Sequence, residues 1–136
     1  MNTKKLHYRL LLTLLIISTV ITAFHYTDNF INFSSYPDPE WLTPQSVYQS
    51  WFILTIVGIM GYILYLKNIL WLAYVCLGIY SLTGMSSPGH YFFQTTETFS
   101  FKMYTLIWLD FIAGTLILGF IIWSGLFLKE WKLVNE

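Results

Sequence analysis

Charge is scarce in this sequence. Only 10% of the 136 residues are Asp, Glu, Lys or Arg, whereas a soluble domain carries about 25%. Hydrophobic residues make up 56%, so too few charged side chains remain to cover a water-facing surface. The composition therefore excludes an ordinary soluble domain. The seven basic and seven acidic residues balance, which gives no reason to expect nucleic acid as a partner.

Cysteine and the common catalytic motifs are also scarce. The single cysteine, Cys76, lies inside an apolar run, so the chain can form neither an internal disulfide nor a dithiol centre. The sequence contains no P-loop, no dinucleotide-binding fingerprint and no G-x-S-x-G motif. These absences remove the familiar soluble enzymes and leave the choice between enzyme and non-enzyme open.

Long apolar stretches are what the sequence does have. A helix needs about 20 mostly apolar residues to cross the hydrocarbon layer, and the runs are continuous rather than alternating, which favours helices over a barrel. The sequence predicts an all-α membrane protein in the lipid bilayer, with one transmembrane domain over residues 1–136. Its bundle of four transmembrane helices is expected at about residues 10–26, 47–66, 69–86 and 103–128.

Local signals mark the ends of these helices. Thr43 before Pro44 is typical of an N-cap followed by proline at the first helical position. Residues 67–68 leave room only for a tight hairpin turn. Pro88 should end the third helix, and Ser100 could cap the fourth. The first loop, about residues 27–42, is expected to be irregular.

Basic residues predict the orientation, because positive charge is retained in the cytoplasm. With the N-terminus inside, four helices place six of the seven basic residues on the cytoplasmic side: Lys4, Lys5, Arg9, Lys67, Lys129 and Lys132. Lys102 is the exception. The outer loops instead carry the acids Asp28, Asp38, Glu40 and Glu97. Both termini are therefore predicted to be cytoplasmic in a multi-pass protein.

A secretory signal peptide is the alternative for the first stretch, which has a basic start, an apolar core and Ala23 as a cleavage site. Small residues are usually found three positions and one position before such a site, and Ile21 fits this poorly. Cleavage would leave three helices and an external N-terminus.

Polar side chains gather toward the predicted outer face. His25 is followed by Asp28 and Asn29, and these offsets of three and four place all three residues on one face if the first helix continues that far. His90 follows the end of the third helix. Asp110 lies seven residues into the fourth helix, about 10 Å below its outer end.

Asp110 is the most informative of these residues. An ionised carboxylate within a membrane helix costs about 2.5–3.5 kcal/mol, so such groups usually face a protein interior or a wet cavity. Two interpretations stay open, a packing role and a functional role. Gly58 and Gly61 in the second helix, Gly78 in the third and Gly114 in the fourth are expected to mark close helix packing.

Three classes of function follow. The first is a binding or catalytic membrane protein that takes a hydrophobic small molecule or a metal ion at an outer site. The ligand-binding residues would be His25, Asp28, Asn29, His90 and Asp110. Of these, His25, His90 and Asp110 suit a transition metal such as zinc or iron, with haem as the less favoured cofactor.

The second class is a structural or accessory subunit bound to a partner membrane protein in a larger complex. The third is an oligomeric transporter of small solutes, which is the least favoured because the first apolar stretch holds no acidic residue.

Overall fold

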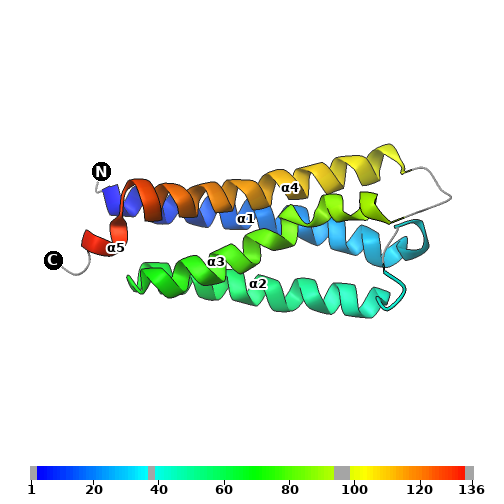
Figure 1. Cartoon of the computed structure of the whole chain (residues 1–136), viewed down its shortest axis with the longest axis horizontal. Helices are drawn as coiled ribbons and strands as arrows, with labels where there is room; N and C mark the ends of the chain where they lie inside the picture. The colour runs from blue at the N-terminus through cyan, green and yellow to red at the C-terminus, as the bar shows by residue number, and fades with distance from the viewer. Residues whose placement is uncertain (1–2, 37–38, 94–98, 134–136) are drawn as a thin grey trace.

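The fold is all-helical. The computed structural model describes residues 3–36, 39–93 and 99–133, and this part of the chain contains no strand. Four long helices lie side by side (Figure 1): α1 (Thr3–Ile31), α2 (Pro44–Leu66), α3 (Leu70–Met85) and α4 (Phe101–Ile122). Shorter segments complete the described chain: η1 (Phe33–Ser35), η2 (Ser87–Phe92), the π-helical η3 (Trp123–Phe127) and α5 (Glu130–Leu133). The predicted all-α class is confirmed.

The four long helices form a closed ring of neighbours, since α1 and α3 each pack against both α2 and α4. Both ends of the chain and the turn between α2 and α3 lie at one end of the molecule, here named the termini end (Figure 1). The C-terminal ends of α1 and α3 and the N-terminal ends of α2 and α4 lie at the opposite end, here named the loop end (Figure 1).

Three helices are long and apolar enough to cross a membrane: α1, α2 and the continuous stretch Phe101–Phe127. They leave large apolar side chains exposed, for example Phe24 and Phe52. Together with the composition, these helices indicate a membrane protein. The fourth, α3, is also apolar but has only 16 residues and spans about 24 Å, less than the roughly 30 Å of the hydrocarbon layer.

The predicted helix starts at Thr43 and Ser100 are confirmed. Thr43 Oγ1 accepts a hydrogen bond from the Ser46 amide at 3.2 Å, and Ser46 Oγ accepts one from the Thr43 amide at 3.0 Å, so α2 begins with a reciprocal capping box. Ser100 Oγ accepts from the Met103 amide at 3.2 Å. In the tight turn between α2 and α3, Asn68 adopts a left-handed conformation with φ 60°, which asparagine tolerates better than most residues.

The prediction for the first helix and its loop is partly wrong. Helix α1 runs from Thr3 to Ile31 rather than over about 10–26, and residues 33–35 form a 3-10 turn, so the segment after residue 26 is not irregular throughout. Hydrophobicity cannot detect the polar ends of a helix, and nothing before Ile31 breaks it. The helix ends where the Asn32 side chain donates to the backbone oxygen and Oδ1 of Asp28.

Two of the predicted outer-loop acids, Asp38 and Glu97, lie outside the described residues.

Glycines let α3 approach its neighbours closely, as small residues do in membrane bundles. A Cβ at Gly58 would lie 2.8 Å from the Tyr80 ring, and one at Gly61 would lie 2.9 Å from Leu77. A Cβ at Gly114 would lie 2.5 Å from a backbone oxygen of α3. The expected close packing is therefore confirmed at these three glycines. It is wrong for Gly78, where a Cβ would meet nothing within 4 Å.

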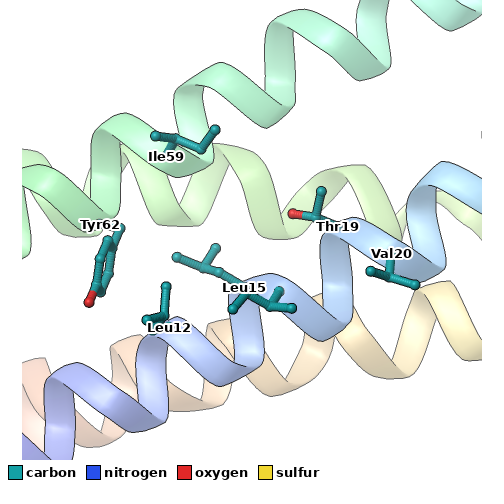
Figure 2. A pocket seen from close by; sticks show the side chains of 7 residues that line it. Leu12, Leu15, Thr19, Val20, Ile59 and Tyr62 are labelled. Carbon is teal, nitrogen blue, oxygen red and sulfur yellow. The ribbon is translucent and has the colours of Figure 1, made fainter.

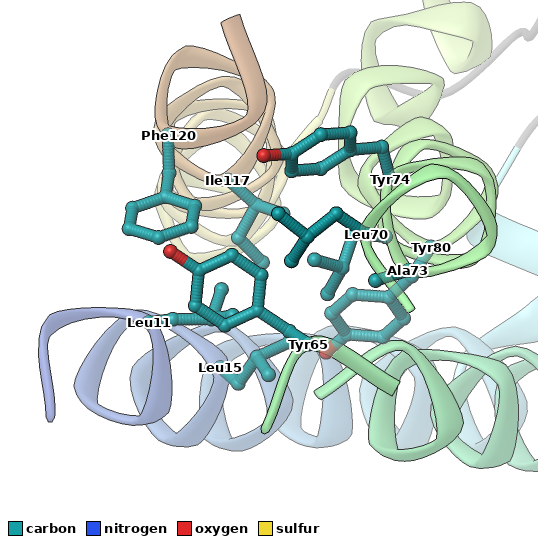
Figure 3. Close-up of a cluster of buried hydrophobic side chains, with 10 residues drawn as sticks. Leu11, Leu15, Tyr65, Leu70, Ala73, Tyr74, Tyr80, Ile117 and Phe120 are labelled. Carbon is teal, nitrogen blue, oxygen red and sulfur yellow. The ribbon is translucent and has the colours of Figure 1, made fainter. Parts of the chain in front are cut away.

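The apolar core lies between the termini end and the middle of the bundle, and its side chains face one another between the helices (Figure 3). Leu11 on α1, Leu77 on α3 and Ile117 on α4 are fully buried there. The rings of Tyr65, Tyr74 and Tyr80 fill the space between the helices, and the hydroxyls of Tyr65 and Tyr74 are satisfied by the polar cluster described next.

A polar cluster, here named the Glu130 cluster, closes the termini end. The Glu130 carboxylate accepts hydrogen bonds from Nδ1 of His7, from the Tyr65 hydroxyl and, at 2.6 Å, from Ser124 Oγ. Tyr74 in turn donates to Ser124 Oγ at 2.8 Å. The cluster joins α1, α2 and α3 to the segment after α4. The wider π-helical turn of η3 and the positive φ of Lys129, 53°, redirect the chain so that Glu130 faces the bundle.

Candidate functional site

Helix α1 aligns three of the sequence-predicted site residues at the loop end. Because the helix continues to Ile31, His25, Asp28 and Asn29 all lie on its buried side, with exposed fractions of 2%, 9% and 3%. Residues four apart on a helix are neighbours on its surface, so His25 and Asn29 present their side chains one turn apart.

Asp110 on α4 is fully buried and meets His25. Nδ1 of His25 donates to Oδ2 of Asp110 at 2.7 Å, and Ser87 Oγ donates to the same oxygen at 2.6 Å. The two donors lie 3.4 Å apart. Three elements, α1, η2 and α4, thus converge on one carboxylate oxygen. The His25 ring meets Asp110 through Nδ1, which leaves its Nε2 without a partner among the described residues.

Gly84 allows this convergence. A Cβ at Gly84 would lie 2.3 Å from the backbone oxygen of Asp110 and 2.9 Å from its Oδ1. Only glycine lets the end of α3 come so close to α4. The same approach brings Ser87, which follows α3 in the chain, within reach of the carboxylate.

Asp28 belongs to a separate group of side chains. Its Oδ2 accepts from the Tyr36 hydroxyl at 2.8 Å, and its Oδ1 accepts from the Asn32 amide at 2.8 Å and pairs with Lys102 Nζ at 2.5 Å. Both oxygens are therefore engaged in holding η1 and the start of α4 against α1. The same carboxylate pairs with Lys102, the one lysine or arginine that the described elements place at the loop end.

His90 lies beside these groups. Its ring centroid is 5.6 Å from that of His25 and 5.1 Å from that of Tyr36, in edge-to-face arrangements. The structure thus brings His25, His90 and Asp110 into one region, with Asn29 one turn from His25.

A cavity of about 330 Å³ opens at the loop end against this region. Its polar lining comes from Asn29, Ser50, Ser86 and His90, and Gly89 also lines it. The remaining walls are Tyr26, Pro39, Trp41, Leu42, Val47 and Phe93. We refer to it as the loop-end cavity.

Buried polar atoms without a partner are concentrated toward the loop end. Among the described residues, five buried side-chain atoms lack a hydrogen-bond partner, and four of them lie at this end: His25 Nε2, Asn29 Oδ1, Thr83 Oγ1 and Asp110 Oδ1. Buried polar groups normally have partners. Of these four residues, Asn29 is the one that also lines the loop-end cavity, so its side chain is the one that a ligand or ordered water there would reach.

No three His, Cys, Asp or Glu side chains within residues 3–36, 39–93 and 99–133 are arranged to share a metal ion. The Oδ2 atom of Asp110 already accepts two hydrogen bonds.

A second cavity, also of about 330 Å³, lies between α1 and α2 in the membrane-spanning part (Figure 2). Its walls include the exposed side chains of Leu12, Ile16, Val20 and Ile59. Because this lining is almost entirely apolar, the groove suits lipid acyl chains rather than a polar ligand.

Sequence reasoning missed Ser87 and Tyr36, which bind Asp110 and Asp28. Serine and tyrosine are common near the ends of membrane helices, so neither carried a signal. It also missed Gly84. The sequence shows a glycine near the end of the third helix, and the structure places it against Asp110.

Comparison of the chain with protein-family models, with curated proteins and with solved structures finds no match in any of the three.

Proposed function

We propose that the protein crosses the membrane four times, with both termini in the cytoplasm and the loop end outside. Six of the seven basic residues lie on the elements of the termini end, and basic residues favour the cytoplasmic side. The 3-10 segment η2 continues α3 toward the loop end (Figure 1), which supports a fourth crossing by a helix that is short on its own.

The function that the geometry supports best is the binding of a small amphipathic ligand in the loop-end cavity, reached from the outer side. One observation carries this proposal. Asn29 is almost fully buried, lines the cavity and has an unpartnered side-chain oxygen. Ligand pockets are commonly apolar clefts of about 300–1,000 Å³ with a few placed polar groups, and the loop-end cavity fits the lower end of that range.

The other predicted site residues have supporting roles in this proposal. His90 lines the cavity beside Asn29, and His25 offers its unpartnered Nε2 from one turn away. Asp110 fixes the orientation of the His25 ring through Nδ1. Asp28 holds the surrounding segments together. A hydrogen-bonded small molecule is favoured over a metal ion, because no three His, Cys, Asp or Glu side chains of the described residues are arranged to share one.

Photocrosslinking in native membranes tests this function. A photoreactive benzoyl-phenylalanine in place of Phe93, a cavity wall, should capture the ligand. The same residue in place of Trp108, which is 49% exposed and does not line the cavity, reports bulk lipid. Mass spectrometry of the adducts should find a species specific to position 93 that Asn29→Leu removes. Identical lipid adducts at positions 93 and 108 would contradict a ligand site.

A further inference from the structure

The hydrogen-bonding character of the loop-end cavity restricts what it can hold. Ser50 Oγ donates its proton to the backbone oxygen of Ser46 at 2.8 Å, and Ser86 Oγ donates to that of Thr83 at 3.0 Å. Each hydroxyl has only one proton. Both serines line the cavity, and because their protons are used, each can offer it only acceptor lone pairs.

Asn29 adds a third acceptor. Its Oδ1 is buried and unpartnered within the described chain. Three of the four polar lining residues, Asn29, Ser50 and Ser86, thus offer acceptors to hydrogen-bond donors on a ligand, and His90 is the fourth. A ligand with several donors on one atom satisfies such a lining best.

The charged residues at the loop end also favour a positive ligand over an anionic one. Asp110 places a carboxyl group behind His25. Lys102 is the one lysine or arginine that the described elements place at the loop end, and it is paired with Asp28. Asp110 is paired with His25 at 2.7 Å, and the described elements leave no unpaired lysine or arginine at the loop end, so nothing there attracts an anionic ligand.

The apolar walls fit a cation as well. Tyr26, Trp41 and Phe93 line the loop-end cavity, and aromatic faces attract ammonium groups, which is the principle of aromatic cages. These rings would also cover the apolar body of an amphipathic ligand.

We propose that the ligand of the loop-end cavity is a primary ammonium ion with an apolar body, bound through Asn29, Ser50 and Ser86 against the aromatic wall. The inference rests on the proposed function, because it specifies the ligand class of the same cavity. The ammonium group supplies three donors on one atom and a positive charge. A neutral alcohol of the same shape supplies one donor and no charge.

Equilibrium dialysis of the full chain in phosphatidylcholine nanodiscs tests the inference. The probe is radiolabelled 2-phenylethylammonium, with 2-phenylethanol as the neutral analogue and phenylacetate as the anion. Empty nanodiscs correct for partition into lipid. We expect saturable binding of the ammonium probe, binding of the alcohol that is about 10- to 100-fold weaker, and no saturable binding of the anion.

Variants assign the binding to the cavity. Asn29→Leu should weaken binding about 10- to 100-fold because it removes an acceptor of a charged donor. Asn29→Asp keeps the acceptor and adds charge, so it should strengthen binding about 10-fold. Thr55→Val is the matched control, since Thr55 Oγ1 is another buried unpartnered atom but does not line the cavity. Its affinity should equal that of the unaltered protein.

The outcomes separate the inference from the proposed function. Equal affinity for the alcohol and the ammonium probe, with the same dependence on Asn29, would overturn the ligand class and leave the cavity as a ligand site. Absence of saturable ammonium binding would also overturn the inference, and the adducts at position 93 would then decide the proposed function independently. Should Asn29→Leu fail to fold, the comparison of probes and Asn29→Asp still decide.

Discussion

The Asp110 carboxylate shows how one buried atom can organise three segments of chain. Its Oδ2 takes both of its hydrogen bonds from residues on other elements, His25 and Ser87. A buried polar group that loses its partner keeps the full cost of desolvation, which exceeds the net gain from an ordinary hydrogen bond. The site is therefore sensitive to the removal of a single hydroxyl.

Ser87→Ala should lower the free energy of unfolding by about 1–3 kcal/mol, because it removes a buried donor from Asp110. The neighbouring Ser86 is the control. Its side chain is exposed and donates only to its own helix, so Ser86→Ala should change stability by no more than about 0.5 kcal/mol. Reversible unfolding in mixed detergent micelles measures both. Equal losses for the two variants would show that Ser87 adds nothing specific to Asp110.

Among single residues, the sequence can predict the importance of those that cost free energy when placed in an apolar membrane helix. Asp110 stands out for that reason, and His25 gains weight from the acid and amide that follow it on the same helical face. Ser87 and Tyr36 are ordinary residues near helix ends and give no such signal. Their hydrogen bonds to Asp110 and Asp28 are visible only in the structure. Glu130 follows the fourth predicted helix, and nothing in the sequence indicates that the chain turns back there.

At the scale of elements, glycine contacts decide how α3 meets α4. Gly84 lies against the backbone of Asp110 and Gly114 lies against the backbone of Ser81, so each helix presents a glycine to its neighbour. Backbone atoms cannot rotate away as a side chain can. The position of the site therefore depends on the distance between these two helices.

Gly84→Ala should destabilise the protein by about 1–3 kcal/mol through overpacking and should also weaken ligand binding by displacing Asp110. Gly78→Ala, in the same helix, meets open space and should be neutral or stabilising, because alanine is the better helix former by about 1 kcal/mol. Thermal unfolding of both variants in one detergent checks this. A Gly84→Ala protein as stable as Gly78→Ala would mean that the helices separate at no cost.

Helix existence was predictable from apolar runs and caps, whereas helix ends were not. Thr43 and Ser100 carry capping chemistry that the sequence displays. The extension of α1 to Ile31 depends on polar residues that pack only because Tyr36 and Lys102 come to meet them. The π-helical turn of η3 depends on the Glu130 cluster, a contact distant in the sequence.

For the whole molecule, orientation is the property on which every functional statement depends. The loop end holds the cavity, and the termini end holds the Glu130 cluster and most of the basic residues. Reversing the molecule in the membrane would open the cavity to the cytoplasm. A direct measurement of sidedness therefore has the widest consequences.

Cysteine labelling with a membrane-impermeant reagent on intact cells measures the orientation of the protein. All variants carry Cys76→Ala, so that only the introduced cysteine can react. Ser34→Cys, at an exposed position of the loop end, should react from outside. Lys67→Cys, in the exposed turn at the termini end, should react only after the membrane is opened. Labelling of position 67 on intact cells, or of position 34 only after permeabilisation, would reverse the proposed orientation.

The Glu130 cluster also has a consequence for biogenesis. A ribosome delivers His7, Tyr65 and Tyr74 to the membrane well before Glu130, which is their shared direct or indirect acceptor. Until the last helix has been released, these side chains have no carboxylate to bind. Closure of the termini end is therefore a late step of synthesis, and a nascent chain stalled after α3 would display an unsatisfied polar surface to the quality-control machinery.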